Sequence, residues 1–358
     1  MTVLNIYKAL AATSSAKLDP IAYAGAMEPK FEKIVVIMDE SIRAEFISPL
    51  DQSGDVTPFL ASIGDATANF GIASSAANCS IPSRLSFRHM LRQSDLASPM
   101  RDLLTRTTVW QYARRAGYRT VHFDAFGSSI TLTSGMGQNE RSFVDQRVAI
   151  MEMPHYKRDM KIAQDLIQAL RKPGRTFIFV EKFGSHVPYP NVYPPNRNVF
   201  VADVSKEFNL SDHKELIKHY KNAVNWTVDG FFQALLKEGL PPDTLLMYTS
   251  DHGQSLSEGG IKLSHCSFAG KMRYGEAAVP LLAFSTKKTW LLELRESAKR
   301  NWGRTSHYNI APTVLLAMGY DRPWVSEVLD PSLLDSIPSN HRRLVRFGDK
   351  PAEFLVEQ

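Results

Sequence analysis

Two pairs of neighbouring polar residues offer donor atoms suited to a metal ion. Asp39-Glu40 follows the apolar run Ile34–Met38. Asp251-His252 stands in the same position after the apolar run Thr244–Thr249. Burying an unpaired carboxylate is costly, and a bound cation removes that cost. Carboxylate oxygens with an imidazole nitrogen suit zinc or manganese. For the acidic pair alone, a solvated loop or helix cap is an equal alternative.

Ser80 has the sequence context of a nucleophile at the start of a helix. A proline follows two residues later, and the apolar stretch Leu85–Leu91 comes next. Serine is favoured at helix N-termini, and proline is tolerated in the first turn. The free N–H groups of that turn bind phosphate or sulfate oxygens, and Arg84 can add a charge-assisted contact. Ordinary helix capping is the alternative, and the nearby Ser74 and Ser75 lack this context.

Two histidines complete the candidate active-site residues. His186 ends the motif Gly184-Ser185-His186 just past a predicted strand, and His265 lies downstream of Asp251-His252, beyond Glu258. A lone histidine is usually structural or solvated, so neither would indicate a site by itself. Four clusters fall at predicted strand ends or at a helix start: Asp39-Glu40, Ser80 with its following residues, Gly184-Ser185-His186 and Asp251-His252. This shared placement favours one metal-dependent site over coincidence.

Short apolar, β-branched runs alternate with amphipathic stretches along the chain. This alternation predicts an α/β fold in which a central, mostly parallel sheet is sandwiched by helices. In such sheets the active residues gather outside the carboxyl ends of the strands. The expected strands are Lys33–Met38, Tyr118–Asp124, Arg175–Glu181, Thr244–Thr249 and Val279–Phe284. The expected helices are Thr57–Ile63, Pro99–Ala116, Met160–Leu170, His213–Glu238 and Asn309–Met318.

The positions of the motifs predict three parts of the chain. Residues 1–30 are expected to be an N-terminal extension or connector along the surface, 31–330 the catalytic domain, and 331–358 a C-terminal extension. The segment Pro188–Asn198 contains four prolines and three asparagines and directly follows His186. We expect it to be a substrate-facing loop.

Composition narrows the classes of partner. The net charge of +5 over 358 residues suits an anionic substrate or an anionic membrane surface. Nucleic acid is not expected, because the chain has no basic helix, zinc-finger spacing or aromatic RNA-binding signature. Its apolar runs are too short for a membrane helix, and its start has no signal-peptide pattern. Cys79 and Cys266 are too few for a disulfide framework, so each is expected to be a small buried residue, not a structural disulfide essential to folding.

The motifs resemble the sulfatase-like branch of the alkaline phosphatase superfamily, most closely the catalytic domain of the lipid A phosphoethanolamine transferases. The resemblance spans residues 31–320. Its most specific part is Asp-His-Gly-x-Ser-Leu. It rests on the segments Ile37–Glu45, Gly184–His186 and Ser250–Ile261, with weaker support from Ser306–Thr313.

This resemblance implies a role for each candidate residue. Glu40, Asp251 and His252 would hold a divalent metal, expected to be Zn²⁺ with Mn²⁺ or Ca²⁺ as alternatives. Ser80 would be the nucleophile and a further ligand. The remaining assignments are Asp39 as an additional candidate ligand, Arg84 as a substrate-binding group, and His186 and His265 as catalytic and substrate-binding groups. His265 is displaced by one position from the family pattern, where this chain has Ser264.

The chain also departs from these transferases. They typically have threonine as the nucleophile, several disulfides, and membrane helices before the catalytic domain. This chain is therefore expected to be a soluble relative, or a catalytic domain whose anchor lies outside the sequence. In the second case it would work at the periplasmic face of the inner membrane.

The implied activity is phosphoryl-group transfer through a phosphoseryl intermediate. A phospholipid donor and a lipid or glycan acceptor of the cell envelope, such as lipopolysaccharide, would be the partners. Ser80-Ile81-Pro82-Ser83-Arg84 also resembles the sulfatase signature, in which the first residue becomes formylglycine. A serine-type sulfatase and a phosphodiesterase or phosphonate hydrolase are therefore alternatives. A non-catalytic anion-binding domain is an alternative of another class.

Overall fold

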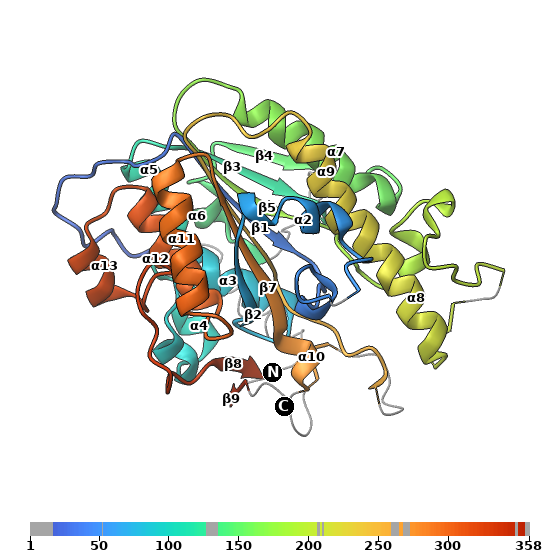
Figure 1. The fold of residues 1–358 in the computed structure, drawn as a ribbon. Helices are drawn as coiled ribbons and strands as arrows, with labels where there is room; N and C mark the ends of the chain where they lie inside the picture. Colours follow the sequence, from blue (N-terminus) through green and yellow to red (C-terminus); the bar gives the residue numbers. More distant parts are fainter. Residues whose placement is uncertain are drawn as a thin grey trace.

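A seven-stranded sheet forms the centre of the molecule. The computed structural model describes residues 17–51, 53–126, 135–205, 208–209, 211–258, 265–267, 273–347 and 350–354. The strands lie in the order β2-β7-β6-β1-β5-β3-β4, and Figure 1 shows them between two layers of helices. Their bounds are β1 (Lys33–Asp39), β2 (Ala68–Ser74), β3 (Arg119–Asp124), β4 (Gln146–Ala149), β5 (Thr176–Glu181), β6 (Thr244–Ser250) and β7 (Ala278–Ser285).

The sheet is mostly parallel, as expected. Only β7 runs against its neighbours, pairing antiparallel with β2 and with β6. β1 lies between β5 and β6 and is parallel to both. Central strands of this kind are buried on both faces, which explains why β1 is a continuous apolar run and not an alternating one. All seven residues of β1 are buried.

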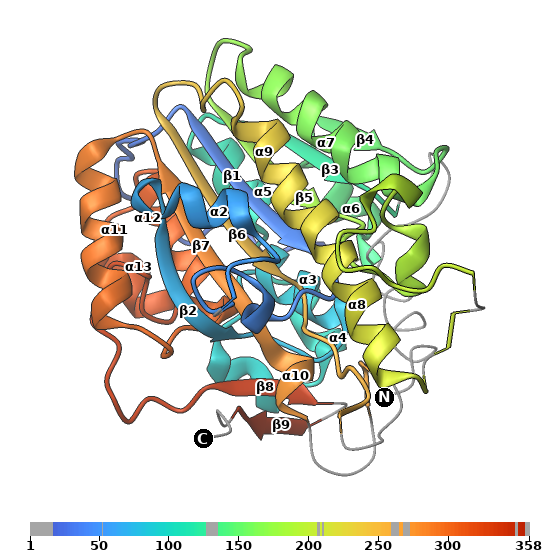
Figure 2. The ribbon, with the colours of Figure 1, turned by 45° about the vertical axis from the view of Figure 1, so that its right-hand side comes forward.

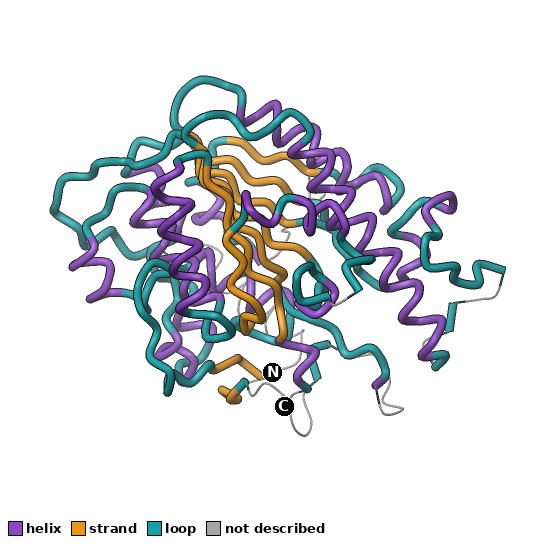
Figure 3. Tube along the Cα trace, viewed as in Figure 1, coloured by secondary structure: helices purple, strands orange, loops and turns teal. Residues whose placement is uncertain are grey.

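Helices cover both faces of the sheet, as Figures 2 and 3 show. On one face Ile34 and Val36 of β1 belong to a core shared with α5, α11 and α12. On the other face Val35 and Ile37 belong to a core shared with α2, α7, α8 and α9. The bounds are α2 (Pro58–Ser62), α3 (Ser80–Arg88), α4 (Met100–Leu103), α5 (Val109–Arg115), α6 (Gln138–Arg141), α7 (His155–Leu170), α8 (His213–Val224), α9 (Phe231–Leu236), α10 (Tyr274–Ala277), α11 (Lys288–Arg300), α12 (Ile310–Ala317) and α13 (Arg322–Val328).

Several elements differ from the sequence-based expectations. The helix expected over Pro99–Ala116 is two helices, α4 and α5. The long helix expected over His213–Glu238 is interrupted by a π-helical turn at Asn225–Gly230. β2 was not predicted, because Asn69 and Gly71 break its apolar pattern and a register shift follows Asn69. β4, α11 and α13 were also missed.

Both ends of the described chain pack against the part of the molecule that contains the central sheet. Lys30 N donates to Ala317 O, and Glu28 N donates to Gly319 O, so residues before β1 follow the surface near α12. A separate hairpin of β8 (Leu344–Phe347) and β9 (Lys350–Glu353) forms near the C-terminus. The division at residues 30 and 330 stays a prediction. Among the described residues, none of the helices combines the length and apolar character needed to cross a membrane.

The segment Pro188–Asn198 forms two short 3-10 turns. Tyr189, Val192 and Tyr193 of this segment are buried in the core that includes α8. The segment is thus anchored by its aromatic residues, and its contact with a substrate stays a prediction.

Candidate active site

Strand pairing brings the two predicted metal-binding motifs together. In the register of β1 and β6, Asp39 pairs with Ser250. Glu40 and Asp251 therefore leave adjacent strands at the same level. Because the strands are parallel, both residues emerge at the carboxyl edge of the sheet, where sites of α/β folds form.

Glu40, Asp251 and His252 form a compact group of donors. One ligand atom from each lies within 4.8 Å of the others. His252 Nε2 is 3.3 Å from Glu40 Oε1 and 3.8 Å from Asp251 Oδ1. His252 Nδ1 lies 2.6 Å from the carbonyl oxygen of Gly253. A carbonyl accepts only, so Nδ1 carries the proton and Nε2 is directed at the two carboxylates.

Ser80 reaches this group from the first residue of α3. Helix-capping preferences suggest Ser80 for the N-cap, but Cys79 occupies that position and Ser80 is the residue after it. Ser80 Oγ donates to Glu40 Oε2 at 3.2 Å and lies 3.1 Å from His252 Nε2. Ser80 is half-buried, whereas all three donors are buried. The hydroxyl is thus the reachable atom of the site.

The electrostatics of the donor group reflect two carboxylates sharing a buried space. Burial and the charge of Glu40 raise the pKa of Asp251 to about 7. Burial disfavours charge on His252, but Asp251 and Glu40 raise its pKa to about 9. Burial also opposes ionisation of Glu40, yet His252 and Arg84 hold its pKa well below the usual range. The group therefore favours positive charge between its carboxylates.

Arg84 lies against the two carboxylates. Its guanidinium is 2.7 Å from Glu40 Oε2 and 2.9 Å from Asp251 Oδ2, and it stacks over Phe126 with 4.7 Å to the ring centroid. Arg84 is 3% exposed. This position suits orientation of the donor carboxylates, whereas the sequence context predicted contact with substrate oxygens.

Asp39, the additional candidate ligand, is not part of the donor group. Its carboxylate forms an ion pair with Lys182 and accepts a hydrogen bond from Tyr248 Oη at 2.8 Å. Asp39 Oδ1 also accepts the N–H of Glu40 at 2.9 Å. The carboxylate is already matched by a fully buried lysine, so Asp39 fixes the backbone that carries Glu40.

His186 and His265 approach the site from different segments. The His265 ring stacks on His252, with centroids 4.6 Å apart and an interplanar angle of 15°. Burial and the charge of His252 lower the pKa of His265 to about 4. His186 packs beside Phe183 and Phe126 and interacts electrostatically with Glu40. Glu258 instead pairs with Arg43.

The motif before His186 needs glycine at its first position. Gly184 has φ of +54°, and a Cβ there would meet the Glu40 backbone nitrogen at 2.7 Å. Ser185 N donates to Glu40 O at 3.0 Å. The close approach of these two loops places His186 beside the donor group.

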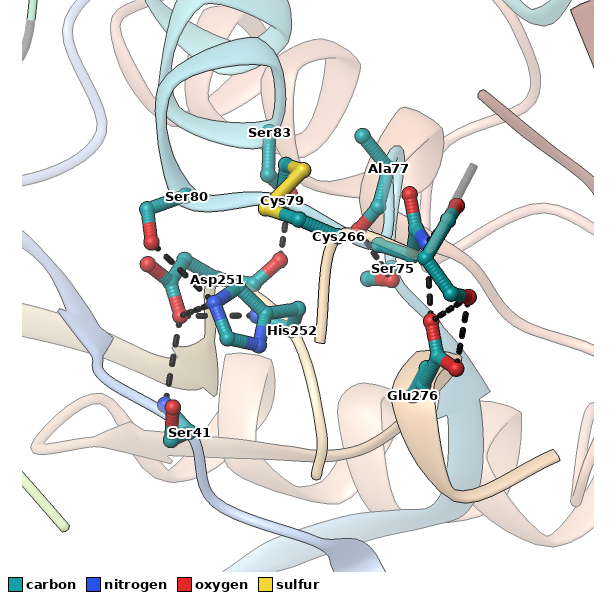
Figure 4. Close-up of a disulfide and its surroundings, with 12 residues drawn as sticks. Ser41, Ser75, Ala77, Cys79, Ser80, Ser83, Asp251, His252, Cys266 and Glu276 are labelled. Carbon is teal, nitrogen blue, oxygen red and sulfur yellow. Dashed lines mark hydrogen bonds and ion pairs between the residues drawn. A yellow bond between two sulfur atoms is a disulfide. The ribbon is translucent and has the colours of Figure 1, made fainter. Parts of the chain in front are cut away.

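Cys79 and Cys266 form a disulfide, and the expectation that they are simply separate buried residues is wrong. Figure 4 shows the bond next to Ser80, Asp251 and His252. The cysteines are 187 positions apart in the sequence. Their pairing depends on the sheet, which brings α3 and the segment after β6 together.

A second buried group lies beside the first and escaped the sequence analysis. His122, Asp124 and Glu181 also place one donor atom each within 4.8 Å of the others. Asp124 and Glu181 end the predicted strands, so inspection of every strand end would have found them. This group is neutralised internally, because Arg88 lies 3.2 Å from Glu181 and Arg147 lies 2.9 Å from Asp124.

The first group fits a divalent metal by the chemistry of its donors. It supplies carboxylate oxygens from Glu40 and Asp251, the imidazole of His252, and a serine hydroxyl next to them. Such a mixed set suits zinc, and an open side for substrate is typical of catalytic sites. The arrangement can hold an anion at the start of α3 and present Ser80 to it.

Comparisons with known proteins agree with this geometry. EptA of Escherichia coli K12, a phosphoethanolamine transferase, is 28% identical over 156 residues, covering 41% of this chain and 28% of that protein. EptA of Salmonella typhimurium is 34% identical over 105 residues, covering 28% of this chain and 19% of that protein. The matches span less than a third of the length of either relative.

Solved structures share the fold. The C-terminal periplasmic domain of EptC from Escherichia coli, in complex with Zn, superposes with a TM-score of 0.73 at 16% identity, covering 94% of this chain and 96% of that domain. The soluble domain of lipooligosaccharide phosphoethanolamine transferase A from Neisseria meningitidis superposes with a TM-score of 0.64 at 18% identity. The match covers 85% of this chain and 91% of that domain. A Vibrio parahaemolyticus protein of the alkaline phosphatase superfamily superposes with a TM-score of 0.59 at 14% identity. The match covers 99% of this chain and 88% of that protein.

The family model described as Sulfatase matches residues 32–320. This range contains both predicted metal-ligand motifs, the start of α3 and both histidines. The resemblance that the motifs indicated is confirmed, and with it the expectation of an enzyme. The chain belongs to the sulfatase family.

Proposed function

We propose that this protein is a metal-dependent phosphoryl-group transferase, similar to the phosphoethanolamine transferases, that works through a phosphoseryl intermediate on Ser80. The observation that carries the proposal is the position of Ser80 Oγ, 3.2 Å from Glu40 and 3.1 Å from His252, at the start of a helix. A nucleophile needs an activating group within hydrogen-bond reach. The names of the curated relatives support the phosphoryl donor.

In this proposal Glu40, Asp251, His252 and Ser80 hold a divalent cation, with Zn²⁺ favoured by the donor set. The Zn complex of the similar EptC domain supports this choice. When bound, such a cation lowers the pKa of a hydroxyl and screens charge on an attacked phosphoryl group. Arg84 and the Asp39–Lys182 pair hold the carboxylates and the Glu40 backbone in position.

Transfer takes place in two displacement steps. Ser80 Oγ loses its proton and forms a bond to phosphorus while the donor's leaving oxygen departs and is protonated. An acceptor hydroxyl then attacks the phosphoseryl group, loses its proton and releases Ser80. His186 or His265 exchanges these protons.

The relatives also suggest the setting of the reaction. Residues 31–330 would form the catalytic domain, and the site would act on a phospholipid donor and a lipid or glycan acceptor. The similar structures are named as periplasmic domains or as part of an integral membrane protein. We therefore place the activity at the periplasmic face of the inner membrane, with the net charge of +5 favouring an anionic surface.

A serine-type sulfatase is the second candidate. Ser80-Ile81-Pro82-Ser83-Arg84 supports it, because the signature is in register with the residue that lies in the site. A phosphonate monoester hydrolase of Agrobacterium radiobacter shares the fold with a TM-score of 0.56 at 15% identity. In these readings the acceptor is water.

The test is the variant Ser80→Ala together with mass analysis of the Ser80 peptide. We expect turnover of a phosphodiester to fall by at least about 10³-fold, because nucleophile and metal act as a unit. The variant should remain folded and metal-loaded. Wild-type protein trapped during turnover should have a phosphoryl-containing adduct on the Ser80 peptide.

Ser86→Ala is the matched control. Ser86 lies on the same helix, is buried, and donates to Pro82 O at 2.7 Å. Its removal should cost about 1 kcal/mol of stability and leave turnover intact. A Ser80 peptide that lacks two mass units before substrate is added would establish the sulfatase. Full activity of Ser80→Ala would reject both enzymatic roles of this residue.

A further inference from the structure

The Cys79–Cys266 disulfide joins the two segments that carry Ser80 and His265. Cys79 is the N-cap of α3 and directly precedes Ser80. Cys266 directly follows His265, and its backbone N–H donates to Asn78 O at 2.8 Å. The disulfide, drawn in Figure 4, and this hydrogen bond together join the His265 segment to the start of α3.

Glu276 holds the same segments from the other side. This fully buried residue accepts hydrogen bonds from Asn78 Nδ2 at 2.8 Å and from Ser267 Oγ at 2.6 Å. Its carbonyl oxygen accepts the N–H of Gly253 at 3.0 Å. The Glu276 side chain therefore connects Asn78, just before Cys79, with Ser267, just after Cys266. The Glu276 carbonyl connects this group to Gly253, which follows His252.

The backbone at Cys266 is in an unfavourable conformation. Its φ of +57° lies in the left-handed region, which residues other than glycine rarely adopt. Such a conformation persists only where the surroundings enforce it, and it is common at functional sites. Here the enforcing contacts are the disulfide and the Asn78–Glu276 hydrogen bonds. Together they direct His265 toward the site.

The result is the stack of His265 on His252. The ring centroids are 4.6 Å apart, and the same His252 ring has its Nε2 3.1 Å from Ser80 Oγ. Shifts of about 1 Å in a positioned group can cost about 100-fold in rate, so we expect a displaced His265 to lower turnover at Ser80.

We propose that the Cys79–Cys266 disulfide is a positioning element that holds His265 stacked on His252, the ring next to Ser80, so that the oxidised protein is the fully active form. The cysteines act through His265 and do not touch the reacting atoms. This inference rests on the proposed function. It places the working enzyme in a compartment where disulfides persist.

The test compares oxidised and reduced protein under native conditions. Tris(2-carboxyethyl)phosphine is the reductant. It takes up one oxygen atom from water as the two thiols gain their protons, and it avoids the metal chelation of dithiols. Mass analysis confirms reduction, circular dichroism confirms folding, and elemental analysis confirms metal content. We expect kcat for a phosphodiester to fall by about 10- to 100-fold with little change in KM. The double variant C79A/C266A should show the same loss and no response to the phosphine.

His265→Ala shows whether the disulfide acts through His265. If it does, reduction should change kcat of this variant by less than about twofold, because two changes in one pathway are not additive. An equal further loss in His265→Ala would overturn the proposal. So would undiminished kcat in fully reduced wild-type protein.

A spectroscopic measurement separates this inference from the proposed function. In protein with ¹⁵N-labelled histidine, reduction should shift the His265 ring resonances. It should leave in place those of His219, a residue of α8 that is hydrogen-bonded to Tyr193. Unmoved His265 resonances in reduced protein would overturn the proposal whatever the activity. Shifted resonances in a protein without turnover in either state would support the positioning and reject the proposed function.

Discussion

Two groups of buried charged residues lie side by side at the carboxyl edge of the sheet, and they differ in how their charge is balanced. Glu40, Asp251 and His252 lie at the ends of β1 and β6, next to a half-buried serine. Glu181 and Asp124, at the ends of β5 and β3, lie with His122 and face arginines from α3 and β4.

Arg84 separates the two groups and contributes to both. Its guanidinium contacts Glu40 and Asp251 and lies 3.9 Å from Glu181. The carboxylates of the second group pair with separate arginines, Arg88 and Arg147, whereas those of the first share Arg84 and lie against the imidazole of His252. Buried carboxylates therefore do not define a metal site by themselves. A histidine nitrogen directed at the carboxylates and a reachable hydroxyl distinguish the first group.

The largest expected effect comes from removing one donor of the first group. Asp251→Asn should lose stoichiometric metal and lower kcat/KM by more than about 100-fold, the upper range for changes to outer partners of a metal. The variant Asp124→Asn, which changes the second group, should keep the metal bound by the first group. Elemental analysis of chelator-free protein measures both. Metal loss in the Asp124 variant alone would reverse the assignment of the two groups.

The second group should matter for stability. Arg88 is fully buried and lies 2.7 Å from Glu140 and 3.2 Å from Glu181. Arg88→Met leaves buried carboxylates without this partner, so we expect a loss of about 3–5 kcal/mol in the free energy of unfolding. Urea unfolding measures it. Stability like that of the wild type, combined with loss of metal, would contradict a structural role for the second group.

Glu140, the other carboxylate paired with Arg88, should make the stability of the protein depend on pH. Burial opposes its ionisation, but Arg88 and His89 lower the pKa of Glu140 to about 2. A lowered pKa adds stability that is present above the unfolded value and is lost as the pH falls toward the folded value. Glu140→Gln should therefore be less stable than wild type by about 1–3 kcal/mol at pH 7.

That difference should shrink as the pH falls from about 5 toward 2, because protonation of Glu140 in the wild type removes the same charge. Denaturant unfolding at a series of pH values measures it. Glu152→Gln, at an exposed position, is the control and should match wild type throughout. A difference that grew on acidification would mean that Glu140 is protonated in the folded protein.

The smallest expected effect concerns the residue between the groups. Arg84→Lys keeps the charge but loses the planar fork that contacts two carboxylates at once. We expect metal affinity to weaken by about tenfold with unchanged KM. Metal titration and steady-state kinetics distinguish the alternatives. A raised KM at unchanged metal affinity would instead support the substrate-binding role that the sequence context predicted.

Local patterns in the sequence determined the fold class and most of the site. Glu40 and Asp251 directly follow the apolar runs that form β1 and β6, and sites of such sheets lie at the carboxyl edge, so the sequence alone predicts that the two residues meet. Ser80 followed from helix-start chemistry and the motif. The positions of these residues could be predicted because strand ends and helix starts are set by neighbouring residues.

Contacts between distant segments were decided only by the tertiary structure. The Cys79–Cys266 bond joins positions 187 residues apart. The pairing of β1 with β5 places Lys182 beside Asp39, so Asp39 forms an ion pair with Lys182 and does not join the predicted metal ligands. The sequence presents such residues as separate candidates, because a side chain's partner depends on strand order and register. The roles of such residues depend on the tertiary structure because a buried charge must be neutralised by a neighbouring group, and the fold decides which group is the neighbour.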